Sequence, residues 1–176
     1  MNPTFLLLAR RSACLLLLVV LSGPIFAQLT KTTNTLTKEV PLDIELKHSD
    51  SKDWLHDMEI VVTNTGEKPI YYLYINLIFD GLKSTSGGYR MGVPLLFGTD
   101  RMYSTVALPE KDDPSIGSHS KISLHISKDA ADAWSGSFAQ GSYPRPTSLT
   151  AELGWISFGD ATGFTGGNVK YGKKNQ

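Results

Sequence analysis

Cysteine is almost absent from this chain of 176 residues, because the only one is Cys14, close to the N-terminus. A domain that follows this residue can form no internal disulfide and no cysteine-ligated zinc site. We therefore exclude the small disulfide-rich scaffolds and the cysteine-based zinc domains. The stability of the folded protein must come from a packed core instead.

Signatures of the common enzyme classes are also missing. The sequence has no G-x-S-x-G nucleophile elbow, no Walker loop and no glycine pattern of a dinucleotide-binding fold. The four histidines, His48, His56, His119 and His125, form no H-x-H or H-x-x-x-H pair. We expect no metal, no cofactor and no catalysis. A hydrolase is a remote alternative that would require His119, His125 and Asp160 to converge in a pocket.

The charge is balanced, with 17 basic and 17 acidic residues. A nucleic-acid partner is not expected, because that function requires a concentrated basic face. The one basic cluster is Lys170, Lys173 and Lys174. It predicts a basic, solvated C-terminal tail over residues 168–176.

Residues 1–27 have the layout of a secretory signal peptide. Arg10 and Arg11 come first, an apolar run over Cys14–Leu21 follows, and the stretch ends at the small residue Ala27. The apolar run is shorter than the roughly 20 residues that span a bilayer. We therefore predict cleavage before Gln28, no membrane span afterwards, and an exported product in the periplasm or outside the cell. Export without disulfides favours a bacterial envelope.

An alternation of apolar and polar residues dominates the chain after residue 40 and predicts β-strands. The clear strands are expected at Val40–Lys47, Met58–Thr63, Ile70–Phe79, Ile122–Ile126 and Leu149–Trp155. Weaker signals lie at Met91–Phe97, which contains Pro94, and at Tyr103–Leu108. Gly154 predicts a bulge within the last of the clear strands. Residues 28–39 show no periodicity, which predicts a flexible lead.

One helix is expected near residues 128–140. Ser127 is a suitable cap, Asp129 suits a first turn, and an apolar stripe with a spacing of four residues follows at Ala130, Trp134 and Phe138. Short strands with turns between them and a single late helix are typical of an all-β antiparallel sandwich rather than of βαβ units. We expect one such domain over residues 40–167.

Three segments carry a resemblance to a known group of proteins. They are VTNTGEKPIYYLYINLIF at 62–79, SIGSHSKISLHIS at 115–127 and GWISFGDATGFTGG at 154–167. Together they resemble uncharacterised small secreted bacterial proteins with an immunoglobulin-like β-sandwich and a C-terminal FGDxTGF-type motif. The resemblance implies an immunoglobulin-like fold but no particular function. Ala161 stands where a glycine is expected in that motif.

Two groups of side chains are candidate contacts for a ligand or partner. Asp160 and Thr162 have the chemistry to hold a cation or a polar ligand, and the alternative is a turn with Gly163 at positive φ and Phe164 closing the end of the sandwich. Tyr72, Tyr74 and Asn76 share a strand face and offer an aromatic platform. The alternative there is that the two tyrosines pack beneath the helix that carries Trp134 and Phe138, while Trp155 belongs to the core.

The function predicted from these features is non-catalytic binding of a protein partner at the cell envelope or outside it. The loops Gly81–Arg90 and Thr99–Ser118 are the first candidates for contact, because long loops in compact domains are often functional. Carbohydrate binding through the aromatic platform is the alternative.

Overall fold

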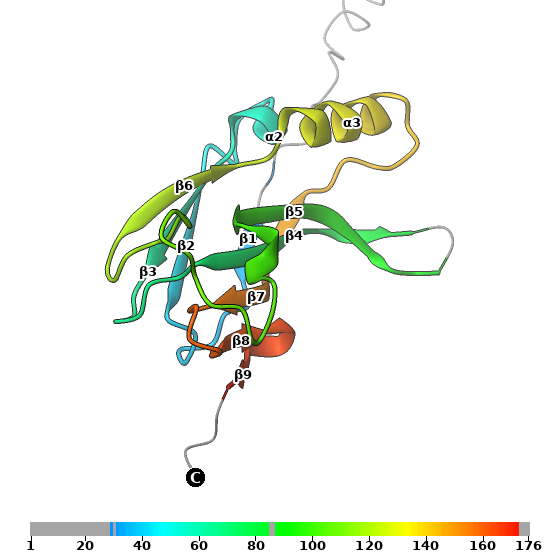
Figure 1. Ribbon diagram of the computed structural model, residues 1–176. Coiled ribbons are helices and arrows are strands. Elements are labelled where there is room, and N and C mark those ends of the chain that lie inside the picture. The colour runs from blue at the N-terminus through cyan, green and yellow to red at the C-terminus, as the bar shows by residue number, and fades with distance from the viewer. Residues whose placement is uncertain (1–28, 30, 85–86, 173–176) are drawn as a thin grey trace, which may run out of the picture.

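The computed structural model describes residues 29, 31–84 and 87–172 (Figure 1). The predicted signal peptide and residues 173–176 of the predicted tail lie outside this range. The described residues form an all-β protein with two sheets and two short α-helices. The elements are β1 (Lys31–Asn34), β2 (Leu42–Lys47), α2 (Trp54–Asp57), β3 (Glu59–Asn64), β4 (Tyr72–Lys83), β5 (Arg90–Gly98), η1 (Asp100–Met102), β6 (Lys121–His125), α3 (Lys128–Ala139), β7 (Ser148–Ser157), β8 (Gly163–Thr165), η2 (Gly166–Asn168) and β9 (Val169–Tyr171).

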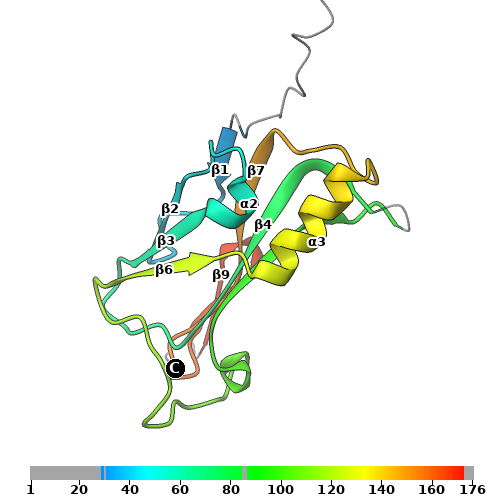
Figure 2. The same ribbon diagram turned by 90° about the horizontal axis from the view of Figure 1, so that it is seen from above.

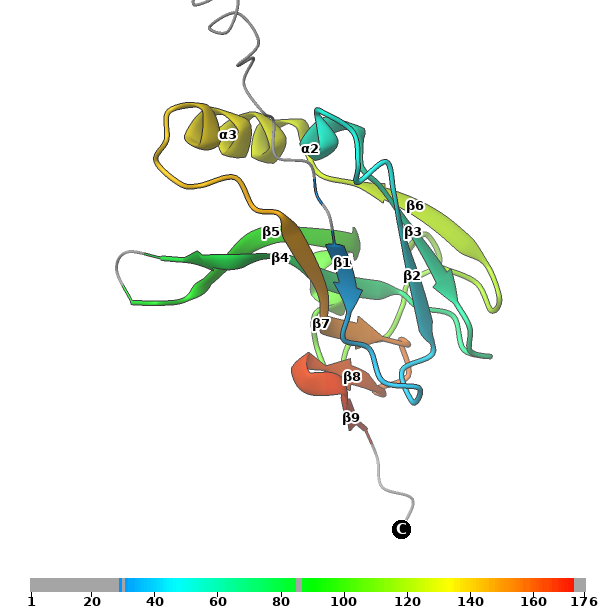
Figure 3. The same ribbon diagram turned by 180° about the vertical axis from the view of Figure 1, so that it is seen from behind.

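The larger sheet has six strands in the order β5-β4-β7-β8-β9, and β1 also pairs with β7. The smaller sheet has the order β2-β3-β6. All pairs are antiparallel except β1 with β7, which is parallel. Figure 3 shows β1 and β2 side by side in the view from behind, although they belong to different sheets.

The core lies between the sheets and is built mainly on β4. Leu73, Ile75, Leu77 and Phe79 alternate along this strand and are fully buried. Residues of β3 such as Ile60 belong to the same cluster. Alternation with a period of two places every second side chain on one face, so the sequence pattern correctly predicted this inner face.

Helix α3 begins at the predicted cap, where the Ser127 hydroxyl accepts a hydrogen bond of 3.3 Å from the Ala130 N–H. Its apolar stripe packs on Phe79, whose ring centroid lies 4.6 Å from that of Trp134 and 5.9 Å from that of Phe138. Figure 2 shows α3 lying along β4, with the short helix α2 close to it. The expectation that Trp134 and Phe138 would cover Tyr72 and Tyr74 is therefore wrong, because the helix packs against the inner face.

Four local expectations are corrected by the fold. Residues 31–34 of the expected flexible lead form β1, which pairs with Ser148–Ala151 of β7, and residues 169–171 of the expected tail form β9. Residues 103–108 form no strand. The expected loop at 81–90 is shorter than predicted, because β4 continues to Lys83 and β5 begins at Arg90.

Pro94 and Gly154 take positions that suit their backbone chemistry. Pro94 lies in β5 at the edge of the sheet, where a residue without an N–H donor is tolerated. Gly154 is the extra residue in β7 between two pairs, Tyr74 with Trp155 and Ile75 with Leu153, so the predicted bulge is confirmed. Among the described residues, no helix has both the length and the apolar character needed to cross a membrane.

Candidate functional site

The outer face of the six-stranded sheet carries three of the predicted contact residues. Tyr72, Tyr74 and Asn76 alternate with the buried residues of β4, and the Tyr74 hydroxyl donates a hydrogen bond of 2.7 Å to Asn76 Oδ1. Tyr74 and Asn76 are half-buried, but Tyr72 is only 5% exposed. This burial raises the pKa of Tyr72. Tyr72 is therefore not free to stack on a sugar.

Tyr103 covers Tyr72 and extends the aromatic surface across the sheet. The ring centroids lie 5.6 Å apart for Tyr72 and Tyr103, 4.9 Å for Tyr103 and Trp155, and 4.9 Å for Trp155 and Tyr171. Trp155 is half-buried on this outer face, so its expected place in the core is wrong. The bulge at Gly154 explains the difference, because one extra residue moves Trp155 to the face of Tyr74.

The segment 99–118, which we call the 99–118 loop, is held together by Asp113. The Asp113 carboxylate is 6% exposed and accepts hydrogen bonds from the Glu110 N–H at 2.6 Å and from the Thr99 hydroxyl at 3.1 Å. It also forms an ion pair with Arg101. The Glu110 N–H lowers the pKa of Asp113 most, and Arg101 lowers it further. The base of the loop is therefore fixed by charge-assisted contacts.

The anchored loop exposes three large apolar side chains, which we call the loop patch. The exposed fractions are 54% for Tyr103, 78% for Val106 and 66% for Leu108. Leu96 on β5 is also more than half exposed, and it pairs with Tyr74 on the same sheet. Single exposed apolar residues are common, but a group of them on one ordered loop is typical of an interaction surface.

The predicted site residues Asp160 and Thr162 lie together, and a third residue joins them. The Lys68 ammonium donates to Asp160 Oδ2 at 2.6 Å and to Thr162 Oγ1 at 3.2 Å. The Thr162 hydroxyl and N–H in turn bond Asp160 Oδ1, at 2.5 Å and 3.1 Å. Burial by itself would raise the pKa of Asp160. The hydrogen bonds from Lys68 and Thr162 outweigh this effect, so the pKa of Asp160 is lowered from its ordinary value.

The backbone of this motif differs in detail from the expected turn. Positive φ occurs at Gly159 (73°) and Ala161 (64°), and the expectation of positive φ at Gly163 is wrong. Gly163 is required for another reason, because a Cβ there would lie 1.9 Å from the carbonyl oxygen of Ile156 on the paired strand. Phe164 is buried at the end of the core, as the turn interpretation expected.

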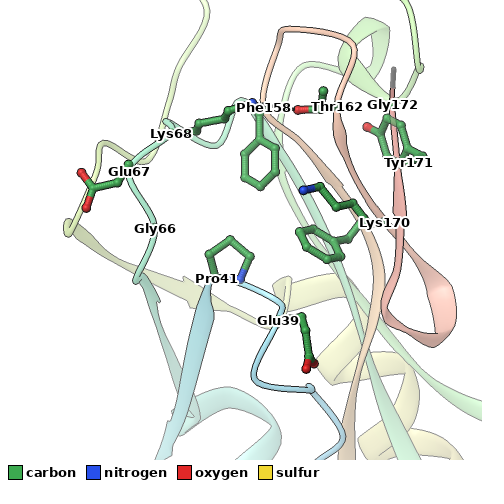
Figure 4. A pocket seen from close by; sticks show the side chains of 11 residues that line it. Glu39, Pro41, Gly66, Glu67, Lys68, Phe158, Thr162, Lys170, Tyr171 and Gly172 are labelled. Atoms are coloured by element: carbon green, nitrogen blue, oxygen red, sulfur yellow. Dashed lines mark hydrogen bonds between the residues drawn. The ribbon is translucent and has the colours of Figure 1, made fainter. Parts of the chain in front are cut away.

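A pocket of about 620 Å³ opens beside this motif, at the end of the two sheets (Figure 4). Four separate segments of the chain line it: the entry to β2, the turn between β3 and β4, the motif after β7, and β9. Its apolar walls include Pro41, Phe158, Phe164 and Tyr171. The rings of Phe158 and Phe164 meet at 6.2 Å in a T-shaped contact, so this wall is firmly packed.

Charged side chains surround the pocket opening. Figure 4 shows the Lys170 ammonium directed into the opening, whereas the carboxylates of Glu39 and Glu67 point away from it. Glu67 contacts His119 Nε2 at 3.2 Å, and a hydrogen bond from Thr37 lowers the pKa of Glu39. Within the described residues, Lys170 makes no ion pair.

Three of the histidines contact different partners. His56 lies between Asp53 and Asp132, His119 contacts Glu67, and the ring of His125 lies 3.3 Å from the Met58 carbonyl oxygen. Over the range that the structure describes, no three histidine, cysteine, aspartate or glutamate side chains are placed to share a metal ion. His119, His125 and Asp160, which a hydrolase would bring together in a pocket, are not among the residues that line the pocket of about 620 Å³.

The sequence did not predict the two ion pairs that hold the motif and the loop in place. Lys68 and Asp160 are 92 residues apart in the chain, and Arg101 and Asp113 lie in a segment without periodicity. The sequence offers no signal for the first pair. It predicts residues 99–118 only as a long loop and does not indicate that Arg101 and Asp113, twelve residues apart, pair and close it.

Comparisons with known protein families, curated proteins and solved structures found no match to this chain.

Proposed function

We propose that this protein is an exported, non-catalytic domain of immunoglobulin-like fold that binds a protein partner at or outside the bacterial cell envelope. The leader-like composition of residues 1–27 supports export to the periplasm or beyond. Two sheets that share one core support the immunoglobulin-like assignment. The resemblance of residues 62–79 and 154–167 to small secreted bacterial domains agrees with both.

The observation that carries the binding proposal is the loop patch. Tyr103, Val106 and Leu108 are more than half exposed on a loop whose base is held by Asp113. A loop that is ordered before binding loses less conformational entropy when a partner docks. Tyrosine is enriched among the residues that anchor protein interfaces, and the buried centre of such an interface is more apolar than its rim, which suits Val106 and Leu108 beside Tyr103.

The composition of the exposed surface favours a protein over a carbohydrate. Val106 and Leu108 are aliphatic and offer no flat ring for a sugar, and Tyr72 is covered. The carbohydrate alternative depends on Tyr103, Tyr74 and Asn76, since the first is half exposed and the other two form a polar edge beside it. Tyr103 is common to both functions, but only protein binding depends on Val106 and Leu108, so variants of these two aliphatic residues separate the two functions.

The test is an affinity capture from the source cell's envelope and culture fluid, followed by reconstitution with the purified partner. The double variant Val106→Asp/Leu108→Asp is expected to lose binding, because two charges would enter the interface. Tyr89→Asp is the matched control, since Tyr89 is 75% exposed but lies in the β4–β5 hairpin. Loss of binding only in Tyr89→Asp would assign the contact to the hairpin and overturn the role of the loop patch.

A glycan array with the same proteins tests the alternative. Sugar binding that is lost in Tyr103→Ala and kept in Val106→Asp/Leu108→Asp would support the carbohydrate function instead of the protein function.

A further inference from the structure

The pocket beside the 158–164 motif has features of a small-molecule site that the loop patch does not explain. Its volume of about 620 Å³ falls in the range of roughly 300–1,000 Å³ that is typical of ligand sites. Its walls come from both sheets and are firmly held. Tyr171, for example, donates a hydrogen bond of 3.0 Å to the carbonyl oxygen of Ile156.

The floor of the pocket is apolar. Phe158 and Phe164 are both at least nine-tenths buried, and Pro41 and Tyr171 add further carbon surface. The Lys68 ammonium lies 5.7 Å from the centroid of the Phe158 ring. An aliphatic or aromatic group of a ligand would therefore be desolvated on this floor.

The opening carries positive charge that the protein leaves available. Lys170 is directed into the opening (Figure 4) and makes no ion pair among the described residues. Lys68 is held by Asp160 and Thr162, which account for two of the three donors of its ammonium group. The nearby carboxylate of Glu67 points away and contacts His119.

We infer that this pocket binds a small amphipathic carboxylate, with its apolar body on Phe158 and Phe164 and its carboxylate beside Lys170. Hydrogen bonds from an ammonium to a carboxylate are among the stronger polar contacts in proteins. The acid is preferred over an amide or an amine, because only an anion benefits from Lys170. This site is separate from the loop patch, so either proposal can fail without the other.

The test is a titration of the ¹⁵N-labelled protein with 4-phenylbutyrate, followed by nuclear magnetic resonance. The neutral 4-phenylbutanamide and the cationic 4-phenylbutylamine serve as probes of the same size. The acid is expected to cause saturable shifts of the Gly66, Phe164 and Gly172 amides, which surround the pocket. The amide and amine are expected to bind at least tenfold more weakly.

Lys170→Gln removes the charge from an exposed side chain and is expected to weaken binding of the acid about tenfold. Lys83→Gln is the matched control, because Lys83 is an exposed lysine at the hairpin end of β4. This variant is expected to bind the acid with unchanged affinity. The inference is overturned if the three probes bind alike, if Lys170→Gln binds as the unchanged protein does, or if ~10 mM acid shifts no pocket amide.

Discussion

At the scale of the residue, the structure shows two positions where the local backbone conformation or its hydrogen bonds make the choice of side chain matter for stability. Ala161 has a φ of 64°, in the left-handed region where side chains with a Cβ are strained. Asn64 is fully buried, and its amide donates to the Lys68 carbonyl oxygen at 2.8 Å and to those of Ile116 and Gly117 at 3.1 Å. Both positions allow a prediction that does not depend on function.

Ala161→Gly is expected to increase the free energy of unfolding by about 0.5–1 kcal/mol, because glycine adopts a positive φ without strain. The gain is partly offset, because glycine also increases the conformational entropy of the unfolded chain. Urea unfolding measures the change. The matched control is Ala133→Gly at an exposed position of α3, which is expected to destabilise by a similar amount. A destabilised Ala161→Gly variant would contradict the argument.

Asn64→Asp is expected to lower the free energy of unfolding by about 2–3 kcal/mol, since a carboxylate of the same shape cannot donate to the three carbonyl groups. Thermal and urea unfolding provide the measurement. Asn76→Asp is the comparison, because Asn76 uses its oxygen to accept from Tyr74 and an aspartate keeps that bond. Equal losses in the two variants would show that the Asn64 amide donors have no special role.

At the scale of the element, α2 and α3 are joined through one histidine. His56 Nδ1 lies 2.9 Å from Asp53 on one side, and Nε2 lies 2.8 Å from Asp132 of α3 on the other. The hydrogen bond to Asp53, followed by that to Asp132, raises the pKa of His56. Because the folded pKa is raised, this stabilisation is complete below the unfolded value of about 6.5 and is lost as the pH rises through the folded value.

The free energy of unfolding is therefore expected to be larger at about pH 5.5 than at about pH 8.5, and His56→Gln is expected to reduce this difference. Urea unfolding at both pH values, with a proton titration of the His56 ring, provides the test. A His56 ring that titrates at or below its ordinary pKa would contradict the proposed link between the helices.

The 99–118 loop gives a second prediction at this scale. Asp113→Asn removes the charge that pairs with Arg101, so amide exchange in the loop is expected to speed up about tenfold while the β4 amides stay protected. Because the pKa of Asp113 is lowered, chiefly by the Glu110 N–H and also by Arg101, we expect this contact to stabilise the loop at neutral pH and to weaken in acid, when the carboxylate takes up a proton. Unchanged exchange in Asp113→Asn would contradict this role.

Elements with strong alternation or a capped apolar stripe were predicted from the sequence, and others were not. The patterns of β2, β3, β4, β6 and β7 and the cap of α3 were predicted, because burial of one face leaves a periodic signal. β1 has the polar sequence Lys-Thr-Thr-Asn and joins the sheet through backbone pairing with β7, which leaves no such signal. β8 and β9 have three residues each, too few for a period to be recognised.

The candidate site was predicted only in part, for the same physical reason. Asp160 and Thr162 were recognised as neighbours in a turn, which is local chemistry. Their contact with Lys68 depends on how distant strands pair, and the outer position of Trp155 depends on a single extra residue at Gly154. Tertiary contacts of this kind cannot be obtained from the spacing of residues in one sequence.

At the scale of the whole molecule, two surfaces remain available after the core is formed. The loop patch is built on the 99–118 loop, and the pocket lies at the end of the sheets beside Lys170. The helices lie over the inner face of β4 near Phe79. A rigid framework with two distinct surfaces suits a binding domain whose function depends on recognition.

The proposed export makes a prediction for the chain as a whole. The protein recovered from the source cell is expected to begin at Gln28, since the apolar run at 14–21 is followed by a small-residue exit at Ala27. N-terminal sequencing and the intact mass of the native protein measure this directly. A native protein that begins at Met1 would contradict export through a cleaved signal peptide.

The central claim is that the loop patch contacts a protein partner, and site-specific photo-crosslinking tests it most directly. A photoreactive amino acid at position 106, activated in the living source cell, is expected to form one reproducible adduct with a single envelope or secreted protein. The same group at position 89, which is exposed to a similar extent in the hairpin, is expected to form none. The account is contradicted if position 106 forms no adduct, or if position 89 captures the partner and position 106 does not.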